Sequence, residues 1–363
     1  GASWESLQLN LPITPITDLK VHQGDLIVAT SGRSFWILDD LKLLQQYSAN
    51  VDQFQLFEPK NAIYGSWYSA LNSSDPDFDG TSTFEGVNPA NGSVIYYNLP
   101  KLKDSTALEL TIKTQDGTLI NSFSSNADEN FSAYAGGPSP TPTLSVDQGL
   151  NRFVWNGRYP ELPGVPGVYI EASYAGHKVA PGTYTLTLTY GAESQSTTAT
   201  ILPNPNLDID AADFEAYHQL MNAMEQQVTA MHTLVNQLKT AEEEIVSMLP
   251  KLKAKNATAL VEQGEALIKD LNAWDSKMVQ RKSKAYDDVE NFENKFSANY
   301  MFVMNQTDSD IPRVNASNKA EFDRMNQEWE SLKAEGLNLL ETRIPNYNAA
   351  LWKAGIGAIP TAE

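Results

Sequence analysis

The sequence lacks cysteine altogether and contains only four histidines among its 363 residues. Without cysteine the chain forms no disulfide, binds no metal through thiolate and carries no thiol nucleophile. The histidines match neither HExxH nor any other zinc-binding spacing: His22, His177, His218 and His232. Because His218 and His232 lie about four helical turns apart, they cannot bind one ion, and we interpret both as ordinary helix residues. Metal catalysis therefore has little support.

The patterns of common nucleotide and acyl-transfer sites are also missing. No G-x-S-x-G nucleophile elbow, P-loop or dinucleotide fingerprint occurs. No apolar run approaches the roughly 20 residues that span a bilayer, and no signal peptide opens the chain. We expect the chain to be a piece of a longer polypeptide, with any signal peptide upstream.

Positive charge is scarce, because 26 basic residues face 45 acidic ones and the formal net charge is -19. This acidity repels phosphate backbones and anionic lipid, so we expect neither nucleic-acid binding nor membrane insertion. It suits a periplasmic or extracellular protein, and it equally serves solubility alone. The length predicts two or three domains, and a hydrophobic content of 41% is sufficient for packed cores.

The first 57 residues carry short apolar segments separated by tight turns. Strands are predicted for three of them: Asp18–Val21, Leu26–Ala29 and Ser34–Leu38. Such a stretch has the size of one β-propeller blade, which does not stand alone. Ahead of it, residues 1–4 match the second half of an Asp-box, the S-x-D-x-G-x-[S/T]-W turn of propeller blades. The alternative is a cloning remnant before an arbitrary tryptophan.

These residues resemble the last blade of bacterial sortilin-like propeller proteins with BNR (Asp-box) repeats, a family whose members carry the name glycosyl hydrolase. The phrase DLIVATSGRSFWILDDL, residues 25–41, is the signature of that blade, and residues 344–355 resemble the family's closing phrase. The resemblance implies a missing N-terminal propeller as partner and a periplasmic or extracellular location. Within the signature, Asp39 and Asp40 are the acids of greatest interest. We expect them, like Arg33, to stabilise a turn.

The middle of the chain alternates β-strand patterns with proline and glycine. The predicted strands are Ser93–Leu99, Ala107–Thr114, Thr118–Phe123, Asn151–Trp155, Gly182–Tyr190 and Ser196–Leu202. Their spacing and period-two alternation predict an antiparallel sandwich. Their order resembles the immunoglobulin-like domain of FlgD-type hook-capping proteins, in which the residue matching Trp155 is a core anchor. Arg158 and Tyr159 beside it are either an exposed ligand patch or ordinary rim residues.

One segment has the pattern of a metal site. Asp75, Asp77 and Asp79 alternate ahead of Gly80, and hard oxygen ligands at this spacing suit Ca²⁺. Glu85 falls at position eleven, where an EF-hand needs its glutamate at twelve, and neither flank has a helical pattern. The alternatives are a non-helical calcium loop formed by these four acids and an exposed acidic loop. Calcium is the one cofactor that the sequence suggests.

From residue 206 onward, apolar residues recur at helical spacing. Helices are predicted from about Asp210 to Lys239, at 242–249, from 256 past 274, at 286–304 and at 318–342. Pro250 and Pro345 are expected to interrupt or end helices. Glu242–Glu244 is interpreted as a solvated helix face. The stripes together imply an antiparallel, four-helix-like bundle.

The patterns combine into a multi-domain α+β protein. We predict a propeller-blade remnant at 1–57, an immunoglobulin-like β-sandwich at 58–205 and a helical bundle with its tail at 206–363. The first functional hypothesis is a non-catalytic accessory region that caps the propeller and binds a protein or a glycan. The alternative is part of a glycosyl hydrolase whose catalytic residues lie mainly in the missing propeller. Only the family name favours that alternative, and the sequence singles out no carboxylate pair.

Overall fold

The computed structural model describes residues 2, 4–47, 52–73, 86–102, 106–309 and 311–359. The chain is a multi-domain α+β protein, as predicted, with 38% of it helical and 20% in strands. It divides into two compact units. The β-rich unit contains Gly1–Asp128, Thr141–Tyr159 and Lys178–Asp208, and the helical unit contains Glu129–Pro140, Pro160–His177 and Ile209–Glu363. The separation of 1–57 from 58–205 stays a prediction.

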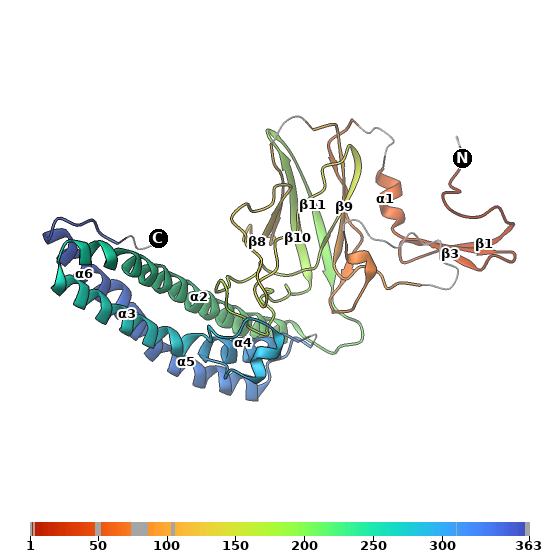
Figure 1. The fold of residues 1–363 in the computed structure, drawn as a ribbon. Helices are drawn as coiled ribbons and strands as arrows, with labels where there is room; N and C mark the ends of the chain where they lie inside the picture. Colours follow the sequence, from red (N-terminus) through yellow and green to blue (C-terminus); the bar gives the residue numbers. More distant parts are fainter. Residues whose placement is uncertain are drawn as a thin grey trace. The chain divides into compact units, whose positions relative to one another are not determined.

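The β-rich unit begins with a small antiparallel sheet. Its strands follow the order β1 (Ile16–His22), β2 (Asp25–Thr30) and β3 (Phe35–Leu38), and a short helix, α1 (Leu41–Gln46), comes next (Figure 1). Gln23 and Gly24 make the β1–β2 turn in left-handed conformations, with φ of 49° and 84°. The three strands predicted here are confirmed.

Two further sheets of this unit pack face to face. One has five strands in the order β5 (Ala62–Ile63), β11 (Glu193–Leu202), β10 (Gly182–Tyr190), β7 (Leu108–Lys113) and β8 (Leu119–Ser124). The other has three, in the order β4 (Gln55–Leu56), β6 (Ser93–Leu99) and β9 (Gly149–Trp155). The pairing is antiparallel except between β11 and β5. All six strands predicted for this region are confirmed.

Along these strands every second side chain points inward, and these inward side chains fill the space between the two sheets. The rings of Phe123 and Phe153 meet with centroids 4.7 Å apart, and those of Trp155 and Tyr184 meet edge to face at 5.4 Å. Trp155 is fully buried. The prediction that it anchors the core is confirmed.

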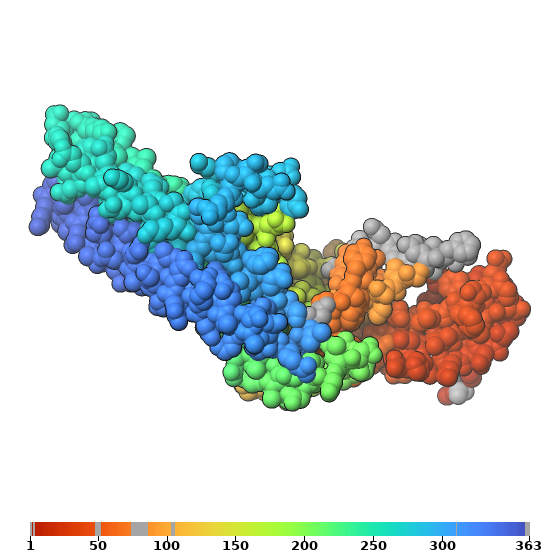
Figure 2. Space-filling view, turned by 90° about the horizontal axis from the view of Figure 1, so that it is seen from below, coloured from red at the N-terminus to blue at the C-terminus, as the bar shows by residue number. Residues whose placement is uncertain are grey.

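The helical unit is built on one long helix, α2 (Ala211–Ala254), which Asp210 caps by accepting a hydrogen bond from the Asp213 N–H. The remaining helices are α3 (Thr258–Met278), α4 (Phe296–Thr307), α5 (Ala316–Asn338) and α6 (Ile344–Lys353), with short turns at Tyr286–Glu290 (η2) and Leu339–Arg343 (η3). In Figure 2 the atoms of α5 and α6 (blue) lie along those of α3 (cyan). Their apolar stripes form one shared core.

Two prolines do not end the helices as predicted. Pro250 lies within the last turns of α2, so it removes a single backbone donor from a helix that tertiary packing supports on both sides of it. Pro345 lies at the start of α6, directly after the π-helical turn η3. Widening the helix by one residue there accommodates a residue that cannot donate to the preceding turn. Helical backbone therefore continues from Ala316 to Lys353.

Two loops from the middle of the sequence belong to the helical unit, which the sequence did not indicate. Leu162, Val165, Ile170 and Tyr174 are buried in the helical core although they lie 37 to 49 residues before the start of α2. Gly164 permits this packing, because a Cβ at that position would lie 2.1 Å from the Tyr134 hydroxyl oxygen. The loops are thus part of the core of the helical unit.

Candidate functional site

The sheet β1–β3 has apolar side chains on both of its faces. The register places Leu19 opposite Val28 and Trp36, and it places Ile37 opposite Ile27 on the other face. Leu19 and Val21 are 59% and 62% exposed on one face, and Phe35 and Ile37 are 74% and 62% exposed on the other. A sheet that borders solvent on one side normally carries polar residues there. This pattern is typical of a sheet that is covered on both faces.

One end of this sheet carries a compact ionic cluster. The Lys60 ammonium contacts both carboxylate oxygens of Asp25, at 2.7 and 2.6 Å. The Asp40 N–H donates to Asp25 Oδ1 at 2.9 Å, while the Asp40 side chain caps α1 by accepting from the Leu43 N–H. Burial, followed by the charge of Asp25, raises the pKa of Asp39. Burial also raises the pKa of Asp40. Asp40 therefore has the turn-stabilising role that the sequence predicts.

The other candidates named from the sequence are separated from this cluster. Arg158 and Tyr159 are half-buried. The Arg158 carbonyl accepts hydrogen bonds from the Asn121 amide at 3.2 Å and the Trp155 indole at 3.3 Å. Its backbone thus supports the sandwich, and a ligand role for the two side chains stays a prediction. The Arg33 carbonyl accepts from the Trp36 indole at 2.9 Å, within the turn before β3.

The predicted calcium loop lies outside the described residues, since Asp75, Asp77, Asp79 and Glu85 all fall within 74–85. Among the residues that the structure does describe, no three His, Asp or Glu side chains gather as metal ligands. Over the same residues, no helix is long and apolar enough to cross a bilayer.

The structure brings together a chain of titratable groups that the sequence did not reveal, of which His177 and Glu225 are buried and His218 is half-buried. Nδ1 of His177 lies 2.9 Å from Oε1 of Glu225, and its Nε2 lies 2.8 Å from Nδ1 of His218. His218 and Glu225 are seven residues apart and share one face of α2, but His177 comes from a loop. Burial, and then the charge of His177, lowers the pKa of His218. The seven-residue spacing was the only local signal of this cluster.

His232, predicted to be an ordinary helix residue, is instead a buried polar junction. Its Nδ1 lies 2.6 Å from the Pro163 carbonyl, and its Nε2 lies 2.6 Å from the Ser297 hydroxyl. This resembles a serine–histidine pair, but both side chains are fully buried and no substrate reaches them. Burial lowers the pKa of His232. A neutral ring donates to the carbonyl and accepts from the hydroxyl, so the pair joins a loop and α4 to α2.

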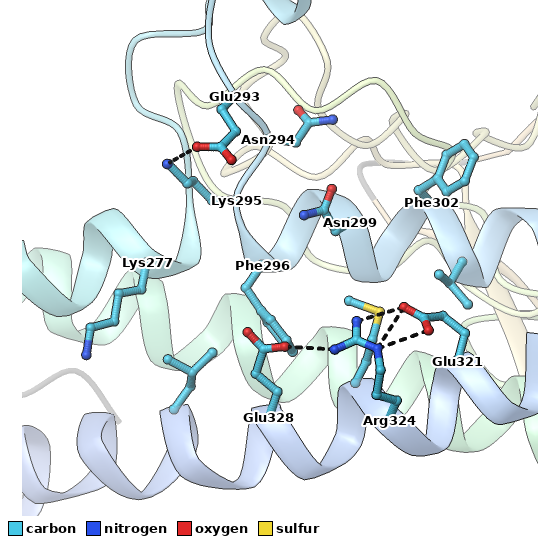
Figure 3. Close-up of a pocket in the computed structure, with 13 residues that line it drawn as sticks. Lys277, Glu293, Asn294, Lys295, Phe296, Asn299, Phe302, Glu321, Arg324 and Glu328 are labelled. Atoms are coloured by element: carbon cyan, nitrogen blue, oxygen red, sulfur yellow. Dashed lines mark hydrogen bonds and ion pairs between the residues drawn. The ribbon is translucent and has the colours of Figure 1, made fainter.

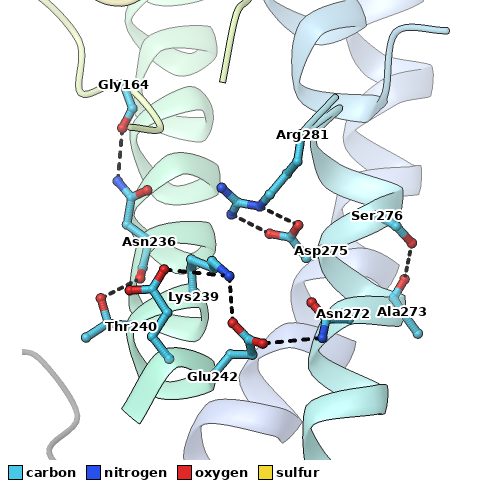
Figure 4. Close-up of polar contacts among 11 residues, drawn as sticks. Gly164, Asn236, Lys239, Thr240, Glu242, Asn272, Ala273, Asp275, Ser276 and Arg281 are labelled. Carbon is cyan, nitrogen blue, oxygen red and sulfur yellow. Dashed lines mark hydrogen bonds and ion pairs between the residues drawn. The ribbon is translucent and has the colours of Figure 1, made fainter. Parts of the chain in front are cut away.

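Polar contacts also extend along α2 and α3 (Figure 4). The Asn236 amide donates to the Gly164 carbonyl at 2.9 Å, and Lys239 contacts Glu242 at 2.6 Å. Glu242 is buried, so the prediction that the whole Glu242–Glu244 run is a solvated face is wrong for its first member. The reason is register: Glu242 points toward α3, where the Asn272 amide lies 3.5 Å from it.

The helical unit also has an open groove of about 630 Å³, which we name the α4–α5 groove (Figure 3). It is lined by the end of α3, residues 293–295, α4 and α5. On α5, Arg324 contacts Glu321 at 2.7 Å and Glu328 at 3.3 Å, and hydrogen bonding to Arg324 lowers the pKa of Glu321. Neither Asp39 nor Asp40 lines this groove or the narrow cleft beside Lys178.

Comparison with known proteins adds little to this description. No family model matches the chain, and no curated protein is significantly similar to it. A solved structure named pT26-6p aligns with 68% of this chain at 11% identity and a TM-score of 0.16. The chain spans 46% of that protein's length.

Proposed function

We propose that this chain is a non-catalytic accessory region of a secreted, sortilin-like BNR-repeat protein, periplasmic or extracellular, and that it caps a β-propeller. In this proposal β1–β3 is the last blade, the two larger sheets form an immunoglobulin-like sandwich, and the helical unit presents an interaction surface. The observation that carries the proposal is the pair of apolar faces on β1–β3, with Leu19 and Val21 on one and Phe35 and Ile37 on the other.

A neighbouring blade is the occupant that this geometry favours. Propeller blades are small antiparallel sheets that stack face to face, so each inner sheet buries apolar side chains on both sides. Burying one large aliphatic or aromatic side chain contributes about 1.5–3 kcal/mol. Because each face carries two such residues, a blade stacked on one face would gain about 3–6 kcal/mol from their burial.

The test is a binding experiment with the β-propeller segment that the proposal places upstream, expressed separately. The chain is compared with a variant that carries Leu19→Thr, Val21→Thr, Phe35→Thr and Ile37→Thr, since threonine keeps β propensity while it removes apolar surface. We expect the chain to co-elute with the propeller and the variant to elute alone. A matched control, Tyr286→Thr on the helical unit, should co-elute like the unsubstituted chain.

Two results would overturn the proposal. One is equal co-elution of the chain and the fourfold variant. The other is turnover of any member of a panel of 4-methylumbelliferyl glycosides by the chain itself, which would favour the glycosyl hydrolase alternative.

A further inference from the structure

The methionines of the chain are confined to the helical unit. The sequence has eight methionines and no cysteine, and residues 1–220 contain neither. The eight are Met221, Met224, Met231, Met248, Met278, Met301, Met304 and Met325. Seven of them are buried in the core of the helical unit, and Met248 packs against it. Thioethers are therefore the only sulfur ligands of this chain, and they gather in one core.

Four of the methionines form two pairs with the same spacing. Met221 and Met224 are three residues apart on α2. Met301 and Met304 have the same spacing on α4. Side chains at this spacing lie on one face of a helix, and each of these four is at most 1% exposed. We name these four residues the methionine quartet.

Two polar contacts show which faces of α2 and α4 meet. Near the start of α2, the Tyr217 hydroxyl donates to Oδ1 of Asp308 at 2.8 Å, and Asp308 directly follows the last residue of α4. Farther along α2, Nε2 of His232 lies 2.6 Å from the hydroxyl of Ser297, near the start of α4. The two helices are therefore antiparallel, and they pack against each other between these contacts.

The methionine quartet lies between the two contacts, on the faces that meet. The stripe of α4 advances by steps of four, three and four residues through Ser297, Met301, Met304 and Asp308. The stripe of α2 has the same steps through Tyr217, Met221, Met224 and Val228. Steps of three and four residues keep side chains on one helix face. The pair on α2 thus lies opposite the pair on α4, so the four thioethers share one part of the core.

Four thioethers in an apolar space favour a soft cation of low charge. Thioether sulfur selects Cu(I), whereas Ca²⁺ and Mg²⁺ take oxygen ligands. The three rotatable bonds of methionine allow the sulfur atoms to converge on an ion. The Asp308 N–H donates to the Met304 carbonyl at 2.9 Å, so the C-terminal end of α4 lies beside the quartet. The partial negative charge of that helix end and the Asp308 carboxylate offset part of the cost of a single positive charge.

We infer that the methionine quartet binds one Cu(I) ion through its thioether sulfurs. The site joins α2 to α4 within the helical unit. It is separate from β1–β3, and the inference does not depend on the proposed docking to a propeller.

The experiment uses Ag⁺ as the first probe, because Ag⁺ is a soft monovalent ion that is stable in air and the chain has no thiol to compete for it. The whole chain is labelled with [methyl-¹³C]methionine and titrated with silver nitrate, and the methyl signals are followed by NMR. Single Met→Leu substitutions assign the signals. We expect saturation at one Ag⁺ per chain, with the four signals of the quartet shifted and those of Met248, Met278 and Met325 unchanged. Zn²⁺ should shift none of them.

A competition experiment with bicinchoninate then measures the affinity for Cu(I) under anaerobic conditions. Met224→Leu combined with Met301→Leu should weaken binding about tenfold or more, because half of the ligands are removed. Leucine conserves the volume of methionine, so the core should stay packed, and circular dichroism at 222 nm checks the fold. The matched control, Met248→Leu combined with Met325→Leu, removes two thioethers from outside the quartet and should bind Cu(I) like the unsubstituted chain.

Three results would overturn the inference. The first is the absence of saturable Ag⁺ binding, and the second is an equal shift of all eight methyl signals. The third is equal affinity of the quartet variant and its control for Cu(I), which would show that the quartet only fills the core. The fourfold variant of β1–β3 should bind Ag⁺ like the unsubstituted chain, so failure of the docking proposal is distinguishable from failure of this one.

Discussion

His177 makes two contacts with a single oxygen of Glu225. Its backbone N–H donates to Oε1 at 2.6 Å, and its Nδ1 lies 2.9 Å from the same atom. Both side chains are buried. Because the backbone of a loop is joined to a side chain of α2 in this way, the contact determines where the loop Pro160–His177 ends on the bundle.

Glu225→Ala should therefore destabilise the helical unit by about 2–3 kcal/mol, since it leaves a buried N–H without its acceptor. Glu225→Gln retains an acceptor oxygen and should cost less. Urea denaturation followed by circular dichroism at 222 nm measures both. Equal stability of the alanine variant and the unsubstituted chain would contradict the structural role of this contact.

The stability of the helical unit should fall in mild acid. Burial lowers the pKa of His232 and of His218, so the folded unit binds these protons less tightly than the unfolded chain does. Their contribution is then fully present above the ordinary histidine pKa of about 6.5 and decreases below it, by up to about 1.4 kcal/mol per pH unit for each group.

Urea midpoints measured between pH 7.5 and pH 5 test this sign. In His232→Gln the unit should be less stable at pH 7.5, and its stability should depend less on pH. His22→Gln changes an exposed histidine of the β-rich unit and should keep the original slope. A helical unit that gains stability in acid would show that the direction is wrong.

Gly336→Ala should destabilise the bundle, although alanine is the better helix former by about 1 kcal/mol. A Cβ there would lie 2.7 Å from the Trp274 ring, which is held by a 2.7 Å hydrogen bond from its indole to the Leu332 carbonyl. Overpacking of this kind costs about 1–3 kcal/mol. Asn338→Ala, at an exposed position of the same helix, should be neutral or slightly stabilising. Thermal denaturation distinguishes the two signs.

Lys178→Met should destabilise the β-rich unit more than Lys60→Met does. The buried Lys178 ammonium donates to the Gly65 carbonyl and to the Ser66 hydroxyl at 2.8 Å, so its removal leaves buried acceptors behind and costs about 1–3 kcal/mol. Lys60 contacts Asp25 in a partly exposed pair, which contributes about 0–1 kcal/mol. Differential scanning calorimetry of the whole chain compares them, and a larger effect at Lys60 would contradict this ranking.

Much of the local structure was predictable from the sequence, because strands and helices depend on periodicity over a few residues. The alternation in residues 93–99 and 182–190 predicted β6 and β10. The stripe that begins near Leu220 predicted α2 as far as Lys239, whereas the helix continues without a break to Ala254. The resemblance of the surrounding strand to FlgD-type domains implied that Trp155 is a core residue, and it is fully buried. Helix ends were less certain, since Pro250 and Pro345 discourage helix locally while packing of the surrounding helices outweighs that cost.

The strands, most of the helices, the acidity and the absence of cysteine chemistry follow from the amino-acid sequence. The three-dimensional fold was needed to show which loops join the helical unit and that Glu242 is buried. It was also needed to show that His177 contacts Glu225 and His218, which lie more than 40 residues away in the sequence. The fold further shows that β1–β3 exposes Leu19 and Phe35 on opposite faces. The physical reason is that periodicity depends on adjacent residues, whereas such contacts depend on how separate elements pack.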